Sequence, residues 1–208
     1  MVEKGIKNLI IDLGGVLVDF EYDRCVEEFQ KIGLPDANKA IAAFKQKGYF
    51  RDYEKGFITS EEFRDEIRKQ MVNEDISDEL IDAAWISILD DIPRYKLDLL
   101  LKLREHYMVY LLSNTNPIHW QWVCEFSFPY RGFRVEDYFD HIFLSYDMHL
   151  LKPDEKIYRT VIETTGINTK ESFLIDDTLE NCKMAESLGF ATYTPKLKED
   201  WSFLFEKS

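Results

Sequence analysis

The first apolar run of the chain reads Asn8-Leu9-Ile10-Ile11-Asp12-Leu13-Gly14-Gly15-Val16-Leu17-Val18-Asp19. An apolar run like this one is typical of a strand buried on both faces, as in the centre of a parallel sheet. Asp12 then stands at the carboxyl end of the strand, where open α/β sheets bind their ligands. A carboxylate there can act as a nucleophile or a metal ligand, and the two glycines let backbone amides approach an anion closely.

Five short apolar runs predict strands, and helical patterns lie between the later ones. The strands are expected at Lys7–Leu13, Met108–Leu112, His141–Leu144, Ser172–Ile175 and Phe190–Thr194. The helices are expected at Pro93–His106, Asp154–Thr165 and Thr178–Leu188. Gly166 and Gly189 follow the last two, as glycines do at helix ends. This alternation predicts right-handed crossovers and an α/β fold with a Rossmann-like, doubly wound parallel sheet.

Residues 19–91 break the alternation, because the segment shows amphipathic helices and no convincing strand. The helices are expected at Tyr22–Ile32, Asp36–Lys47, Ser60–Met71 and Ser77–Leu89. Thr59 and Glu62 have the spacing of a capping box before the third of them. We therefore predict a core domain formed by residues 1–18 and 92–208, with a helical cap subdomain, residues 19–91, inserted close to Asp12. Such a cap would exclude water and select the substrate.

The composition is that of a protein with a solvated, acidic surface. The 208 residues carry a net charge of −13, which argues against binding to nucleic acid or to an anionic membrane. No apolar stretch approaches the roughly 20 residues that span a bilayer, and the N-terminus lacks a secretory cleavage site. The three scattered cysteines favour reduced thiols in the cytoplasm. The oligomeric state is left open.

Polar residues follow the predicted strands at their carboxyl ends. Asp12 stands at the end of the first, and later strands are followed by Ser113-Asn114, Lys152-Pro153 and Asp176-Asp177. In a parallel sheet these side chains converge on one edge, where three carboxylates repel one another unless a cation lies among them. Oxygen ligands without histidine or thiolate suit Mg²⁺, and a lysine beside a hydroxyl suits a phosphate group. The pattern predicts Mg²⁺-assisted phosphoryl transfer through an aspartyl-phosphate.

With these four motifs, the chain closely resembles the haloacid dehalogenase (HAD) superfamily over essentially its whole length, in the phosphatase-like branch with a helical cap after the first strand. The resemblance implies that Asp12 is the nucleophile and a Mg²⁺ ligand, with the Gly14 carbonyl as a second ligand. Ser113 and the Asn114 amide would hold the phosphate, and Lys152 would bridge the nucleophile and the phosphate. Asp177 would bind the metal directly, and Asp176 directly or through water, with Asn181 behind them.

One position departs from the family pattern. Most phosphatases of the family carry a second aspartate two residues after the nucleophile, as the general acid and base, where this chain has Gly14. General acid–base catalysis is typically worth about 10²–10⁴-fold. We hypothesise a preference for leaving groups that need little protonation, such as anomeric sugar, aryl or acyl phosphates. Asp19 is a candidate substitute acid, and Arg51, Glu54 or Lys55 in the Tyr49–Gly56 segment could reach the substrate.

The leading interpretation is a Mg²⁺-dependent phosphatase of a small phosphorylated metabolite, for instance a sugar phosphate. A metal-independent 2-haloacid dehalogenase also uses an aspartate nucleophile, but it has no need of Asp176 and Asp177. A non-catalytic binding or regulatory module is the second alternative, since the acid is missing at Gly14. The aromatic segment between Trp120 and Phe139 would then be a partner surface, although packing on the core is the simpler interpretation of these rings.

Overall fold

The computed structural model describes residues 2, 4–43, 48–73 and 75–205. Within them a five-stranded parallel sheet has the order β3-β2-β1-β4-β5. The strands are β1 (Asn8–Ile11), β2 (Met108–Ser113), β3 (His141–Leu144), β4 (Ser172–Ile175) and β5 (Ala191–Tyr193). The order reverses beside the central β1, which makes the sheet doubly wound and confirms the predicted α/β fold class.

The register of the sheet aligns the chemistry-bearing residues. Ile11, the last residue of β1, is paired with Leu111 of β2 and with Ile175 of β4. Asp12 and Asp176 therefore leave the sheet at the same level, next to the point where the strand order reverses. All four residues of β1 are buried, as its apolar sequence predicts.

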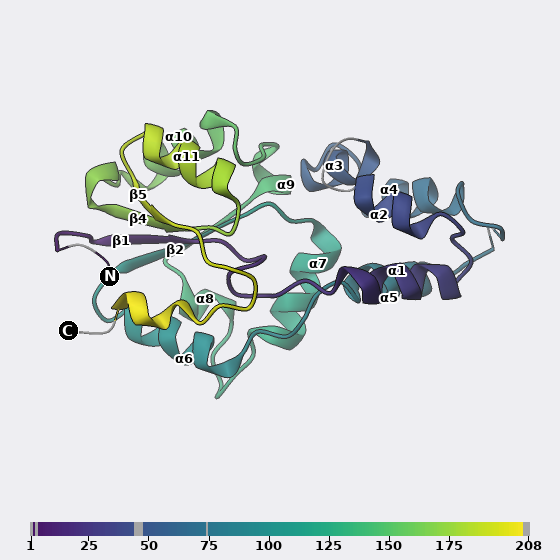
Figure 1. Ribbon diagram of the computed structural model, residues 1–208, viewed down its shortest axis with the longest axis horizontal. Coiled ribbons are helices and arrows are strands. Elements are labelled where there is room, and N and C mark those ends of the chain that lie inside the picture. The colour runs from purple at the N-terminus through teal and green to yellow at the C-terminus, as the bar shows by residue number, and fades with distance from the viewer. Residues whose placement is uncertain (1, 3, 44–47, 74, 206–208) are drawn as a thin grey trace.

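Helices cover both faces of the sheet (Figure 1). On one face lie α10 (Glu155–Thr165) and α11 (Leu179–Ser187), and on the other α6 (Arg94–Leu103) and the short α8 (Val135–Tyr138). Ile10 packs with the cluster under α10 and α11, whereas Leu9 and Ile11 belong to the larger cluster of the opposite face. Shorter helical segments are α7 (Pro117–Trp122), a π-helix (Val123–Ser127), α9 (Ser145–Met148) and 3₁₀ turns at Thr169–Glu171 and Trp201–Phe205.

The helical insertion extends to the right of the sheet in Figure 1. It contains α1 (Tyr22–Lys31), α2 (Ala37–Ala43), α3 (Tyr49–Glu54), α4 (Ser60–Arg68) and α5 (Asp78–Ile86). The chain enters and leaves through two segments that lie side by side: the Glu21 N–H donates to the Ile88 carbonyl (2.7 Å) and the Asp90 N–H to the Asp19 carbonyl (2.9 Å). We propose that these segments divide the core from the cap, as the sequence predicts for residues 19–91.

Local signals in the sequence correspond to several helix ends. Thr59 and Glu62 form the predicted capping box, and Gly166 ends α10 in the left-handed conformation. The helix expected at Asp36–Lys47 is described only to Ala43, because residues 44–47 lie outside the described residues. No helix among the described residues is both long and apolar enough to cross a membrane. The three cysteines form no disulfide.

The sequence predicts no helix over Tyr49–Gly56, but six of its residues form α3, whose Phe50 and Tyr53 are buried. The Tyr53 ring stacks on Phe63 of α4 at 4.3 Å between centroids, and such tertiary packing stabilises helices too short to form alone. In the aromatic segment Phe128, Tyr138 and Phe139 are buried, in agreement with packing on the core.

Candidate active site

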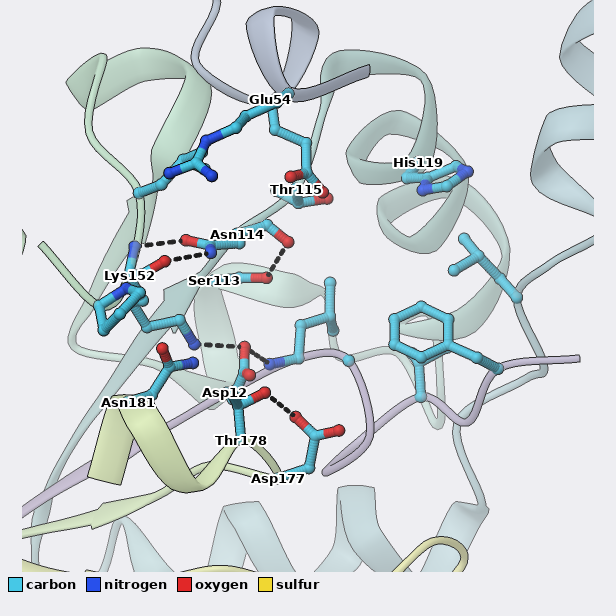
Figure 2. Close-up of a pocket in the computed structure, with 18 of the residues that line it drawn as sticks. Asp12, Glu54, Ser113, Asn114, Thr115, His119, Lys152, Asp177, Thr178 and Asn181 are labelled. Carbon is cyan, nitrogen blue, oxygen red and sulfur yellow. Dashed lines mark hydrogen bonds and ion pairs between the residues drawn. The ribbon is translucent and has the colours of Figure 1, made fainter. Parts of the chain in front are cut away.

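A buried lysine reaches Asp12 in the site (Figure 2). Lys152 Nζ is 2.9 Å from Asp12 Oδ1 and 2.7 Å from Asp176 Oδ2, and it donates to the Leu112 carbonyl at 2.9 Å. Burial alone would lower the pKa of Lys152, but the charges of Asp12 and Asp176 outweigh it and raise the pKa above its ordinary value. Lys152 is therefore a cation at neutral pH, placed between two carboxylates.

The Asp12 carboxylate is held in place by two donors. Its Oδ1 accepts the Leu13 N–H at 2.8 Å in addition to the contact with Lys152. Burial raises the pKa of Asp12 well above its ordinary value, and the charge of Lys152 opposes this rise. The lysine thus favours the ionised, nucleophilic form of a carboxylate that burial would otherwise keep protonated.

Asp176 is surrounded by donors from its own loop. The Asn181 amide donates to both of its oxygens (2.9 and 3.0 Å), and the Thr178 N–H donates to Oδ1 at 2.9 Å. Asp177 is exposed and lines the pocket, where it accepts from the Thr178 hydroxyl at 3.3 Å. This difference favours Asp177 as the direct metal ligand and Asp176 as a ligand through water.

The carboxylates of Asp12, Asp176 and Asp177 form a group that fits a hard cation. One oxygen from each lies within 4.8 Å of the others, and the donors are all oxygen, as Mg²⁺ prefers. Gly15 allows this arrangement, because its backbone has φ +70° and a Cβ there would lie 2.3 Å from Asp177 Oδ2. When bound, Mg²⁺ would neutralise the charge of the phosphate and of these carboxylates.

Ser113 and Asn114 lie between the acidic group and the cap in Figure 2. The Asn114 side chain donates to the Lys152 carbonyl (3.0 Å) and accepts its N–H (2.9 Å), so that it holds the lysine segment in place. Ser113 is buried at the end of β2, where its hydroxyl is 3.4 Å from the Asn114 carbonyl. The structure thus brings the predicted Ser113, Asn114 and Lys152 together beside Asp12.

The site opens into a pocket of about 460 Å³ that the core and the cap line together. Arg51 and Glu54, which the sequence predicts to be within reach of the substrate, line it, and so does Asn181. Other lining residues are not predicted from the sequence, among them Phe20, Tyr22, Thr115, His119 and Glu180. Burial lowers the pKa of His119 to about 4, and its ring bonds to the Trp85 carbonyl, which indicates a neutral structural histidine. Asp19, the candidate substitute acid, does not line the pocket but is buried near Lys96.

The sequence and this geometry point to one family. The model of the haloacid dehalogenase-like hydrolases matches residues 6–189. The chain belongs to this family. The match confirms the predicted family and a hydrolase as the class of enzyme.

Three relatives of this hydrolase cover nearly its whole length. D-ribitol-5-phosphate phosphatase of Bacteroides thetaiotaomicron is 35% identical over 94% of this chain and 95% of its own. A HAD family enzyme of the same organism is 57% identical, with a TM-score of 0.95 over 98% of this chain and all of that one; its structure contains magnesium and inorganic phosphate, in a variant whose own Asp12 is alanine. A HAD-like family hydrolase of Porphyromonas gingivalis is 32% identical, with a TM-score of 0.88 over 98% of this chain and all of its own.

The Phe20 ring explains how this HAD-like hydrolase accommodates glycine at the usual acid position. A Cβ on Gly14 would lie 2.4 Å from Phe20 Cζ, so the ring fills the space in which an aspartate side chain would start. The glycine and the phenylalanine are therefore structurally coupled, because a Gly14→Asp change would require the Phe20 ring to move.

Gly14→Ala is expected to lower the free energy of unfolding by about 1–3 kcal/mol, because the new methyl group overpacks against Phe20. Chemical denaturation of both proteins measures the loss. The same substitution in a Phe20→Ala background should cost much less, since that background removes the ring. An equal penalty in both backgrounds would show that Phe20 does not limit the space at Gly14.

Proposed function

We infer that this protein is a Mg²⁺-dependent phosphatase of a small phosphorylated sugar or polyol, with Asp12 as the nucleophile. The observation that carries this proposal is the contact between Asp12 and Lys152 beside the Asp176–Asp177 pair. The relatives bear out the predicted phosphatase class and cofactor, since one is a phosphatase and another holds magnesium and phosphate. The predicted cytoplasmic location and the absence of a nucleic-acid partner stay predictions.

Different residues of the chain would have different roles in phosphoryl transfer. Lys152 and the Leu13 N–H orient the Asp12 carboxylate toward the phosphorus atom. The Ser113 hydroxyl and the Asn114 N–H would bind the phosphate oxygens, while Asp177 holds the metal. Asp12 forms the aspartyl-phosphate as the substrate alcohol leaves, and water then releases inorganic phosphate from it.

The alternatives fit the site less well. A dehalogenase shares the aspartate nucleophile but does not need the acidic group that Asp177 completes in the pocket. A binding module would not need a buried Lys152 held against two carboxylates, because desolvating such charges is unfavourable.

A polyol or sugar phosphate fits the pocket as the substrate. The D-ribitol-5-phosphate phosphatase shares 35% identity with nearly the whole chain, and the pocket of about 460 Å³ presents both charged and hydrogen-bonding side chains to hydroxyl groups. A primary polyol phosphate has a poorly activated leaving group. A polyol phosphate substrate therefore disagrees with the preference for activated leaving groups that Gly14 predicts. The assay below compares the two kinds of substrate and decides between these predictions.

Removal of the metal and a substrate panel test the function. The purified protein is assayed on ribitol 5-phosphate, glucose 1-phosphate and p-nitrophenyl phosphate, with Mg²⁺, with EDTA, and with Mg²⁺ restored. We expect turnover that EDTA abolishes and Mg²⁺ restores, with the highest kcat/KM for the polyol phosphate. Chloride release from 2-chloropropionate in EDTA would favour the dehalogenase instead, and no turnover on any ester would favour the binding module.

A further inference from the structure

We propose that Glu54, which the cap contributes to the pocket, is the general acid and base of the reaction in place of the family aspartate that is absent at Gly14. This inference rests on the proposed phosphatase function. It assigns the leaving-group proton to a residue on a different element from the nucleophile. It would also explain how a chain with Gly14 and Phe20 at the usual acid position cleaves an unactivated phosphate ester.

Glu54 lies where a leaving group would emerge. It is the last residue of α3 and lines the pocket on the side opposite Asp12, with Ser113 and Lys152 between them (Figure 2). Attacking and leaving oxygens lie roughly in line in phosphoryl transfer. An ester bound for attack by Asp12 therefore directs its leaving oxygen toward the cap and toward Glu54.

Hydrogen bonds hold the backbone at Glu54 against the core. The Ser145 hydroxyl donates to the Glu54 carbonyl at 2.6 Å, and His149 Nδ1 donates to the Lys55 carbonyl at 2.8 Å. Gly56 packs so closely that a Cβ there would lie 2.2 Å from the Tyr146 carbonyl oxygen. These contacts hold the end of α3 against residues 145–149, and such support is what a catalytic side chain needs.

Glu54 has the environment of an acid that also serves as a base. Burial raises the pKa of Glu54 to about 7, against the charges of Arg51 and Lys152, which lower it. A group with this pKa populates both forms at neutral pH, which suits donation in one step and acceptance in the next. The other acids that line the pocket are Asp12 and Asp177, which have roles already, and the exposed Glu180.

The two steps balance with Glu54 as the proton carrier. In the first, an Asp12 oxygen bonds to phosphorus, the bond from phosphorus to the alcohol oxygen breaks, and that oxygen takes the proton of Glu54. In the second, ionised Glu54 takes a proton from water as the water oxygen bonds to phosphorus. The bond from phosphorus to Asp12 then breaks, which releases phosphate and restores both residues.

Glu54→Gln tests the proposal, with Asp52→Asn on the exposed side of the same helix as the matched control. We expect kcat/KM for ribitol 5-phosphate to fall by about 10²-fold or more, because its alcohol needs a proton to leave. Cleavage of p-nitrophenyl phosphate should give a rapid burst of one nitrophenol per active site and then a slow steady state, since the water lacks its base. Asp52→Asn should change both substrates less than twofold.

The pH profile gives a second readout. The acid form of Glu54 donates, so the wild-type kcat/KM for ribitol 5-phosphate should decline as pH rises above about 7, and Glu54→Gln should lose this decline. Arg51 and Lys152 are the charged groups that act on Glu54, the neutral His119 and Tyr22 also line the pocket, and His149 lies at the Lys55 carbonyl next to Glu54. A decline that persists in the variant would overturn the proposal.

Other outcomes are also decisive. Equal losses on the alkyl and aryl esters without a burst would show that Glu54 only shapes the pocket, and unchanged kinetics would show that it has no role; either result overturns the inference alone. A wild-type protein that hydrolyses no phosphate ester would overturn the proposed function, and this inference with it.

Discussion

Asp12→Asn is expected to reduce the turnover of every phosphate ester by at least about 10⁴-fold, because it removes the atom that attacks phosphorus. Asparagine keeps the size and shape of the side chain but has no carboxylate to form the aspartyl-phosphate. The Mg²⁺-dependent release of inorganic phosphate measures the loss, with Asp52→Asn as the control for a neutralised acid elsewhere. Turnover above about one hundredth of wild type would assign the nucleophile to another residue.

The loss of activity should not come from unfolding. Burial raises the folded-state pKa of Asp12 well above 3.8, so stability falls as pH rises from 3.8 toward that pKa. The asparagine variant lacks this penalty, and in EDTA at neutral pH it should unfold at the wild-type temperature or above. Mg²⁺ should stabilise wild type more than the variant, because the variant lacks one carboxylate ligand. A large drop in the unfolding temperature in EDTA would mean that lost activity reports misfolding.

Lys152→Met is expected to lower the free energy of unfolding by about 3–5 kcal/mol at neutral pH, because the variant leaves Asp12 and Asp176 buried without their cation. Methionine has a similar length, so the loss reports the charge rather than a cavity. Urea denaturation in EDTA measures the loss in the free energy of unfolding. Lys156→Met on the exposed surface of α10 is the matched control. That control should change stability by less than about 0.5 kcal/mol.

The pH dependence of this effect has a defined sign. The folded-state pKa of Lys152 lies above 10.5, so its stabilising contribution is fully present below pH 10.5 and is lost at higher pH. The difference between wild type and Lys152→Met should stay nearly constant from pH 7 to 9. The difference should shrink in acid, because the Asp12 carboxyl of the variant, whose pKa burial raises, can then take up a proton. A difference that does not shrink in acid would show that packing, and not charge, makes Lys152 important.

The parallel sheet makes much of the site predictable from the order of the residues. Asp12, Ser113 and Asp176 each follow an apolar run, and the register that aligns Ile11 with Leu111 and Ile175 follows from burying those runs in one sheet. Because the strands end at the same level of the sheet, side chains more than 60 residues apart along the chain come together there. For this reason the α/β fold and the group around Asp12 could be predicted without coordinates.

Contacts between the cap and the core could not be predicted in this way. Stacking of Tyr53 on Phe63 supports the helix α3, and Ser145 and His149 hold the carbonyls of Glu54 and Lys55 against the core. These contacts join segments whose sequences share no periodic pattern, so neither segment by itself predicts them. The acidic residues and the type of chemistry follow from the sequence. Whether Phe20 closes the space at Gly14, and which acid faces the leaving group, depends on how the cap packs against the sheet.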